Sequence, residues 1–161
     1  MRDIHLSSGI SLINKSFNKN QFYHYFKEAN NVLVIPIINN KFIIVEQKRI
    51  PINKKNFEFP VGRVDVGEKN INAANRELLE ETGYKARAPL KKLVSFFADP
   101  GRNVRKVHCY YIKDLELVSK PEKGIKIHFV DKKKLEKLVN NKKFNNAFNI
   151  AAFYYFLYKN L

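Results

Sequence analysis

The chain has 161 residues, of which 45% are hydrophobic, enough for one globular domain with a sizeable core rather than a disordered protein. Lysine and arginine number 30 against 15 aspartates and glutamates, and the resulting net charge of +15 attracts anions such as phosphate esters, nucleic acid or acidic lipid. No apolar run reaches the roughly 18–20 residues of a membrane span, the N-terminus lacks a signal-peptide core, and the only cysteine, Cys109, excludes an internal disulfide, so we expect a cytoplasmic protein with no membrane partner.

Residues 1–30 are predicted to form a short β region. Two short strands are expected at Ile4–Leu6 and Ile10–Ile13, around a turn at Ser7-Ser8-Gly9. Aromatic residues follow with polar residues between them, a pattern that ordinary half-buried strands also show. They include Phe22, Tyr23 and Tyr25.

Two runs rich in β-branched residues, Asn31–Ile37 and Lys41–Gln47, flank the polar pair Asn39-Asn40 and predict a β-hairpin. The second run leads into Arg49, and an arginine just beyond a strand end can fork onto a diphosphate. The alternative is a solvated charge at the rim of the sheet. Residues 51–56 are predicted to form a loop.

The densest acidic cluster of this basic chain lies between residues 62 and 84. Glu77 and Glu81 are four residues apart, so they share one face of a predicted helix; Glu80 lies beside them and Glu68 precedes the helix. Like charges at this spacing destabilise an isolated helix by about 0.2–0.5 kcal/mol per pair. A hard cation such as Mg²⁺, which suits one or two carboxylates plus substrate phosphate, is the simplest explanation.

The helix carrying this cluster is predicted to begin near Asn70, a good N-cap residue, and to end at Gly83, a good C-cap residue. Its inward face is expected to be apolar, because three hydrophobic residues keep helical spacing: Ile71, Ala74 and Leu78. A solvated amphipathic helix with pairs such as Arg76–Glu80 is the alternative explanation of the charges.

Further elements are predicted along the rest of the chain. Strands are expected at Leu93–Phe97, Val107–Ile112, Leu115–Val118 and Ile125–Val130, with a turn at residues 98–101. Helices are expected at Asp131–Asn140, where Asp131 is the N-cap, and at Phe144–Leu161.

The spacing of fixed residues from Gly62 to Tyr84 resembles the Nudix box in full, and the chain resembles the Nudix hydrolases, which cleave nucleoside diphosphates linked to another moiety. The resemblance implies an α/β fold, the Nudix α/β/α sandwich with a mixed β-sheet. It places the Nudix domain at 31–161 and makes 1–30 an N-terminal β region that could pack against a second subunit. A homodimer is therefore expected, in which Phe22, Tyr23 or Tyr25 could reach the neighbour's base pocket.

The resemblance also implies roles for individual residues. The metal, Mg²⁺ or Mn²⁺, would be held by the side chains of Glu77 and Glu81 and by the backbone carbonyl of Val61. Glu80 and Glu68 would assist or bind further ions, and Arg76 would orient the glutamates by ion pairing. A glutamate in the loop after residue 118 often acts as general base in the family, which here points to Glu122, with Glu80 as the other candidate.

Three further segments resemble the ADP-ribose pyrophosphatase group. Gln47-Lys48-Arg49 is similar to a motif whose arginine contacts substrate phosphate. Phe57–Gly62 is similar to the lead-in of the box, and Glu58 in this segment is expected either to bind substrate or to pair with a lysine. The segment SFFADPG places Pro100 at the family's position, 16 residues after Tyr84, and makes its neighbours candidate substrate contacts. These candidates are Pro100, Gly101 and Arg102. The nucleoside-binding glutamate that many members carry four residues after the proline–glycine pair is absent, because residues 102–106 contain no carboxylate.

The function that the resemblance implies is metal-dependent hydrolysis of the diphosphate bond of a nucleoside diphosphate sugar. ADP-ribose, cleaved to AMP and ribose 5-phosphate, is the first expectation. The charge and the missing glutamate leave open another nucleotide sugar, a dinucleoside polyphosphate or an RNA 5′ end. A non-catalytic RNA-binding module on a Nudix fold is the alternative from another class, and the complete set of glutamates weighs against it.

Overall fold

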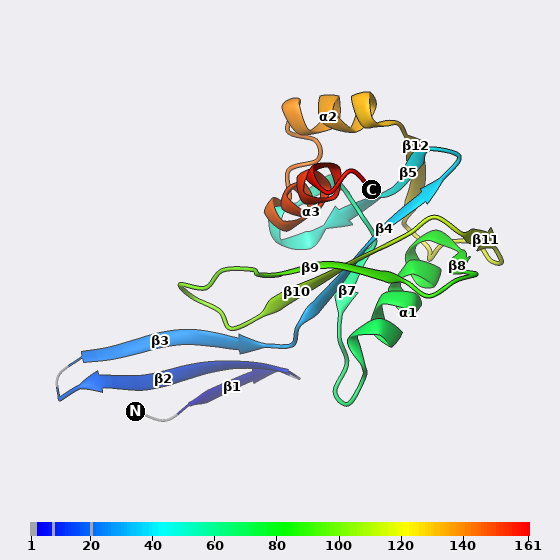
Figure 1. The fold of residues 1–161 in the computed structure, drawn as a ribbon. Coiled ribbons are helices and arrows are strands. Elements are labelled where there is room, and N and C mark those ends of the chain that lie inside the picture. Colours follow the sequence, from blue (N-terminus) through cyan, green and yellow to red (C-terminus); the bar gives the residue numbers. More distant parts are fainter. Residues whose placement is uncertain (1–2, 8, 20) are drawn as a thin grey trace.

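In this computed structural model, which describes residues 3–7, 9–19 and 21–161, the central element is a hairpin (Figure 1). Strands β4 (Asn31–Ile38) and β5 (Lys41–Arg49) are joined at Asn39 and Asn40, whose φ angles of 49° and 57° lie in the left-handed region. Asparagine tolerates this conformation, and two such residues in succession match the twist of a two-residue hairpin turn. The predicted hairpin is confirmed.

The hairpin belongs to a mixed seven-stranded sheet with the order β12-β5-β4-β10-β9, to which β6 adds beside β5 and β7 beside β4. Only β10 and β4 are parallel, and the other pairs of this sheet are antiparallel. The remaining strands of the sheet are β6 (Lys54–Glu58), β7 (Val61–Arg63), β9 (Lys91–Phe97), β10 (Lys106–Ile112) and β12 (Lys126–Val130). The predicted pairing of Leu93–Phe97 with Val107–Ile112 is confirmed.

Strands β4 and β5 separate soon after their turn, and this separation shapes the site described below. They pair directly only at Ile37–Phe42 and Ile38–Lys41. Farther from the turn, β5 pairs with β6 and β4 pairs with β7. The link between β6 and β7 therefore crosses the opening, where the carbonyl of Pro60 accepts a hydrogen bond from the N–H of Val34 at 3.0 Å.

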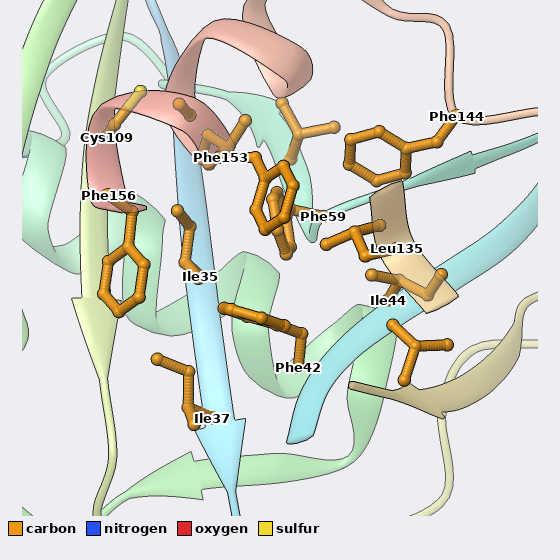
Figure 2. Packing of buried hydrophobic residues seen from close by; sticks show 14 of the residues in the cluster. Ile35, Ile37, Phe42, Ile44, Phe59, Cys109, Leu135, Phe144, Phe153 and Phe156 are labelled. Carbon is orange, nitrogen blue, oxygen red and sulfur yellow. The ribbon is translucent and has the colours of Figure 1, made fainter. Parts of the chain in front are cut away.

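Helices cover both faces of the sheet. Successive side chains of a strand point to opposite faces, so neighbouring residues of one strand contact different helices. Leu33 and Ile35 of β4 face the helices α2 (Lys132–Asn140) and α3 (Ala147–Tyr158) (Figure 2). The residues that pack with them include Phe42, Phe59, Leu135, Phe144, Phe153 and Phe156. Val32 and Val34 instead face α1 (Asn70–Thr82), which contributes Ala74 and Leu78. This arrangement and the match to a known fold described below confirm the predicted α/β/α sandwich.

The N-terminal residues form a separate antiparallel sheet of β1 (Ile4–Ser7), β2 (Ile10–Asn18) and β3 (Gln21–Glu28), which extends beside the main body (Figure 1). Both predicted strands are confirmed, and the predicted aromatic residues lie on the third, β3. Ser8 of the predicted turn lies outside the described residues. The end of β3 is joined to the loop before β10, since the N–H of Phe26 donates to the carbonyl of Arg102 at 2.8 Å.

Three expectations need correction. The segment 51–56 is not a loop throughout: a 3₁₀ turn at Ile50–Ile52 and a left-handed residue, Asn53 (φ 47°), reverse the chain so that β6 pairs with β5. The last helix is shorter than predicted, because Phe144 packs into the core before the helix begins. Helix α1 includes Asn70 as its first residue, and Lys69 takes the preceding position without a side-chain cap.

Two short strands form a small separate sheet, and one helix has the predicted cap. Strands β8 (Tyr84–Ala86), which was not predicted, and β11 (Leu115–Leu117) pair with each other. Asp131 caps α2 as predicted, accepting a hydrogen bond from the N–H of Lys134 at 2.7 Å. No helix among the described residues has the length and apolar character required to cross a membrane.

Candidate active site

Helix α1 ends at Gly83, and this residue fixes where the following loop lies. Its φ is 75°, and a Cβ atom built on it would stand 2.1 Å from the carbonyl oxygen of Ser119. The Gly83 carbonyl accepts hydrogen bonds from the N–H groups of Val118 and Ser119 at 3.0 and 3.1 Å. The N–H of Glu122 then donates to the carbonyl of Glu80 at 2.9 Å, so the loop brings Glu122 against the acidic end of the helix.

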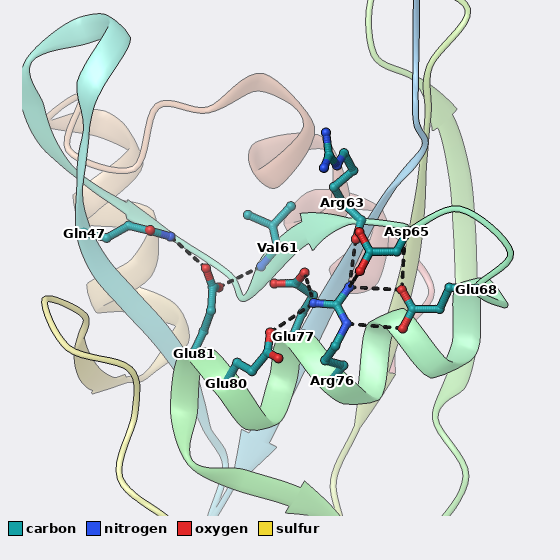
Figure 3. Close-up of polar contacts among 9 residues, drawn as sticks. All are labelled: Gln47, Val61, Arg63, Asp65, Glu68, Arg76, Glu77, Glu80 and Glu81. Atoms are coloured by element: carbon teal, nitrogen blue, oxygen red, sulfur yellow. Dashed lines mark hydrogen bonds and ion pairs between the residues drawn. The ribbon is translucent and has the colours of Figure 1, made fainter. Parts of the chain in front are cut away.

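Glu81 reaches the opening between β4 and β5, where it is 6% exposed. Its Oε2 accepts a hydrogen bond from the N–H of Val61 at 2.9 Å, and its Oε1 accepts one from the side-chain amide of Gln47 at 3.0 Å (Figure 3). Burial raises the pKa of Glu81 to about 7, although both hydrogen bonds act in the opposite direction. The carboxyl group thus lies where its negative charge is poorly solvated and a cation would stabilise it.

Glu77 lies one turn before Glu81 and packs against the backbone of Gly62. A Cβ atom at position 62 would stand 1.9 Å from the carboxyl carbon of Glu77, so only glycine leaves room for this carboxylate. Burial, together with the charges of Glu80 and Glu122, raises the pKa of Glu77 despite its ion pair with Arg76. Position 62 is therefore a glycine: the carboxylate of Glu77 occupies the space that a side chain at this position would need.

Arg76 joins three glutamate carboxylates on the outer side of this cluster and forms a longer ion pair with Asp65 at 3.9 Å (Figure 3). Its guanidinium donates to Glu77 at 2.7 Å, to Glu80 at 3.0 Å and to both oxygens of Glu68 at 3.1 and 3.2 Å. A further N–H donates to the carbonyl of Arg63 at 2.9 Å, and the hydrogen bonds from Arg76 hold the pKa of Glu68 below its usual value. These hydrogen bonds fix the carboxylates relative to one another and to β7.

Arg49 is bound by a buried carboxylate rather than standing free at the strand end. Its Nε and Nη2 donate to the two oxygens of Glu58 at 3.1 and 2.5 Å, and Glu58, which is 1% exposed, also accepts from the amide of Asn56 at 2.9 Å. Among the described residues, Nη1 of Arg49 has no hydrogen-bond partner. Of the two alternatives for Glu58, the lysine partner is replaced by an arginine, because β6 pairs with β5 and places Glu58 within hydrogen-bond distance of Arg49.

An open cavity of about 410 Å³ lies beside this cluster. Arg49, Val61 and Gly62 line the wall next to the glutamates, and Glu28 and Arg105 also line the cavity. The position four residues after the Pro100-Gly101 pair, where the resemblance implies a glutamate, is Arg105. Its Nη1 donates to Glu28 at 2.8 Å. A carboxylate is thus present in the cavity, but it comes from the N-terminal sheet.

Three predicted substrate contacts are not brought into this cavity. Pro100, Gly101 and Arg102 lie in the exposed loop between β9 and β10, against the N-terminal sheet. The hydroxyl of Tyr23 donates to the carbonyl of Gly101. The loop turns away from the glutamates because Arg102 pairs through its backbone with β3.

The donor set fits a hard divalent cation that shares its ligands with a substrate. Glu77 and Glu81 present carboxylates of raised pKa on one helix face, and Glu80 lies next to them. No three acidic, histidine or cysteine side chains of the described residues are grouped closely enough to hold an ion by themselves. Two carboxylates completed by water, backbone carbonyls and phosphate oxygens are the surroundings that Mg²⁺ usually takes.

Sequence reasoning missed several residues that hold the site in place. Gln47 lies two residues before Arg49 and so faces the same side of β5, a signal that strand alternation alone provides. Asn149 on α3 accepts a hydrogen bond from the N–H of Phe59 at 2.6 Å and fixes the segment before Val61. No local signal in the sequence pointed to this fully buried asparagine.

Comparison with known proteins gives a family match over most of the chain. The model described as the NUDIX domain matches residues 27–147. A structure described as the crystal structure of ADP compounds hydrolase superposes with a TM-score of 0.78 at 21% identity, covering 96% of this chain and 88% of that one. This likeness shows the fold.

Three curated relatives were found among others. An ADP-ribose pyrophosphatase of Bacillus subtilis is 32% identical over 65% of this chain and 57% of its own length. A methanol dehydrogenase activator of Bacillus methanolicus is 42% identical over 52% of this chain and 45% of its own length, so these two matches span about half of each relative. The ADP compounds hydrolase NudE of Escherichia coli is 27% identical over 94% of this chain and 79% of its own length.

The space at Gly62 can be tested with Gly62→Ala. The added methyl group displaces the flexible end of Glu77, so we expect a folded protein whose affinity for Mn²⁺ falls by about 10- to 100-fold, the usual cost of disturbing a residue that supports a metal ligand. Electron paramagnetic resonance measures the binding. Gly67→Ala is the control, because its methyl group meets nothing within 4 Å and adds only backbone strain. Equal affinities of both variants would contradict the geometry.

The role of Arg76 can be tested with Arg76→Lys, which keeps the charge but loses the fork that serves three carboxylates. We expect Mn²⁺ affinity to fall by about 10- to 100-fold in the same measurement. Arg87→Lys is the matched control, since the Arg87 guanidinium makes an exposed ion pair with Asp114 at 3.7 Å, away from the acidic cluster. Wild-type Mn²⁺ binding by Arg76→Lys would show that the guanidinium does not organise the cluster.

Proposed function

The chain belongs to the Nudix family, and on that premise we propose that it is a metal-dependent pyrophosphohydrolase that cleaves the diphosphate bond of a nucleotide sugar. The observation that carries the proposal is the pair Glu77 and Glu81 on one helix face, with Glu81 buried where two strands separate. Burying two neighbouring carboxylates is unfavourable unless a cation or proton compensates them. A metal-binding role supplies that compensation.

ADP-ribose is the proposed substrate, with AMP and ribose 5-phosphate as products. Two relatives support this choice: the Bacillus subtilis protein is an ADP-ribose pyrophosphatase, and the Escherichia coli protein is an ADP compounds hydrolase. The cavity beside the glutamates, lined by Arg49, accommodates an anionic small molecule. Mg²⁺ or Mn²⁺ is the proposed metal, and we also propose a homodimer, an N-terminal β region over residues 1–30 and a cytoplasmic location.

The residues take distinct roles in this proposal. Glu77 and Glu81 hold the metal, with the Val61 carbonyl and Glu80 or Glu68 as further oxygen ligands. A bound Mg²⁺ supplies neutralisation of charge on the diphosphate oxygens and lowers the pKa of a water molecule. Arg76 holds the glutamates in fixed positions relative to one another through hydrogen bonds to three of them.

Arg49 and Glu122 complete the chemistry. Glu58 holds two N–H groups of Arg49, and the third nitrogen, Nη1, is left to donate to a phosphate oxygen. Glu122, brought to the acidic end of α1 by the loop that Gly83 fixes, is the proposed acceptor of the proton of the attacking water, with Glu80 as the other candidate. Phosphoryl transfer depends on such positioning and electrostatics rather than on a protein nucleophile.

The direct test is AMP release from ADP-ribose with Mg²⁺ and with EDTA. We expect hydrolysis only with the metal, and a loss of about 10²–10⁴-fold in kcat for Glu81→Gln and Glu77→Gln, the range typical of groups that act in the chemical step. Glu116→Gln is the control, because Glu116 is an exposed glutamate on β11. Full activity of Glu81→Gln would contradict the proposal.

A substrate panel separates the remaining alternatives. Metal-dependent cleavage of another nucleotide sugar, a dinucleoside polyphosphate or an RNA 5′ end in place of ADP-ribose would support the proposed reaction but with a different substrate specificity. No hydrolysis of any member, combined with salt-sensitive RNA binding that is unchanged by EDTA and by Glu81→Gln, would support the non-catalytic RNA-binding module instead.

A further inference from the structure

The cavity beside the glutamates contains a carboxylate that the chemistry above does not use. Glu28, the last residue of β3, lines this cavity together with Arg49, Arg63 and Arg105. Three guanidinium groups suit an anionic substrate, whereas a carboxylate in the same cavity repels phosphate. The part of the cavity beside Glu28 therefore suits a group other than phosphate.

The carboxylate of Glu28 is held in place by Arg105, whose own position is fixed by backbone contacts. Its Oε2 accepts a hydrogen bond from Nη1 of Arg105 at 2.8 Å. The N–H of Arg105 is itself bound to the side chain of Asn103 at 2.7 Å, and Asn103 forms a β-bridge with Phe26 on the strand that carries Glu28. The two residues are thus fixed relative to each other by backbone contacts as well as by their charges.

This ion pair leaves hydrogen-bonding capacity unused. Among the described residues, the second oxygen of Glu28, Oε1, accepts no hydrogen bond, although its side chain is only 23% exposed. Oε1 of Glu28 is thus an acceptor in the cavity wall that the protein's described residues leave unused. A ligand that donates a hydrogen bond can use it.

We propose that Glu28 is a specificity-determining residue, whose carboxylate is oriented by Arg105 and accepts hydrogen bonds from a hydroxyl or amino group of the substrate on the side away from the scissile diphosphate. Arg105 acts as a positioning residue. The inference rests on the proposed function, because it takes the glutamates and Arg49 as the diphosphate end of the cavity. It adds to that function the residue that selects for a distal part that is neutral and rich in hydrogen-bond donors, over one that carries further phosphates.

The test compares two ligands in Glu28→Gln. With ADP-ribose, we expect KM to rise by roughly 10- to 100-fold while kcat stays within about threefold, since a hydrogen bond to a charged acceptor is lost but the diphosphate end is unchanged. With diadenosine tetraphosphate, whose extra phosphates meet less repulsion, KM stays constant or falls. Arg105→Gln raises KM for ADP-ribose in the same way, and Arg105→Lys, which keeps the charge, restores part of the affinity.

Controls separate this role from a structural one. Asp114→Asn removes the carboxylate of an exposed arginine pair outside the cavity and is expected to leave KM unchanged. If Glu28→Gln leaves KM for ADP-ribose at the wild-type value, or weakens both ligands by the same factor, the inference is wrong. Thermal unfolding of each variant confirms that the fold is retained.

A binding measurement keeps this inference separate from the proposed function. Calorimetric titration with ADP-ribose in EDTA, where no hydrolysis is expected, measures affinity alone. Weaker binding by Glu28→Gln than by wild type supports the role of Glu28, even if the wild-type protein shows no hydrolysis and the proposed function fails. Equal binding by both proteins, with hydrolysis intact in the wild type, overturns the inference and leaves the proposed function standing.

Discussion

The burial of Glu81 is the constraint on which the rest of the site depends. Its carboxylate sits where β4 and β5 have separated, and it is held by the N–H of Val61 and by the amide of Gln47. These contacts join α1, β5 and the first residue of β7, so one side chain fixes three elements at one point. Burial disfavours the charged form of Glu81 by more than these two hydrogen bonds stabilise it, so a cation beside the carboxylate would stabilise the site.

Two glycines make this arrangement possible by removing side chains. Gly62 gives its Cβ space to the carboxylate of Glu77, and Gly83 lets the loop that carries Glu122 fold onto the end of α1. In both cases the close approach of another group, more than chain flexibility, requires the glycine. The glutamates are thereby brought together from a helix and from a loop that is distant from it in the sequence.

The acidic face of α1 was predictable because its residues are close in the sequence, and helical spacing alone places Glu77 and Glu81 together. The hairpin followed from β-branched runs around two asparagines. The pairs Gln47–Glu81 and Glu28–Arg105 were not predictable, since they join residues 34 and 77 positions apart and depend on where strands separate or meet. The partner of Arg49 was not predictable for a related reason: the pairing of the segment before Glu58 with β5, which its sequence does not indicate, decides which side chains meet.

The most direct test of this account is a crystal structure with Mn²⁺ and a non-hydrolysable analogue of ADP-ribose, in which anomalous diffraction locates the metal. We predict a manganese peak between the carboxylates of Glu77 and Glu81, with the diphosphate of the analogue beside Arg49. An analogue bound in the cavity with no manganese at the glutamates, or manganese and analogue bound elsewhere on the protein, would contradict the central claim that Glu77 and Glu81 form the metal centre.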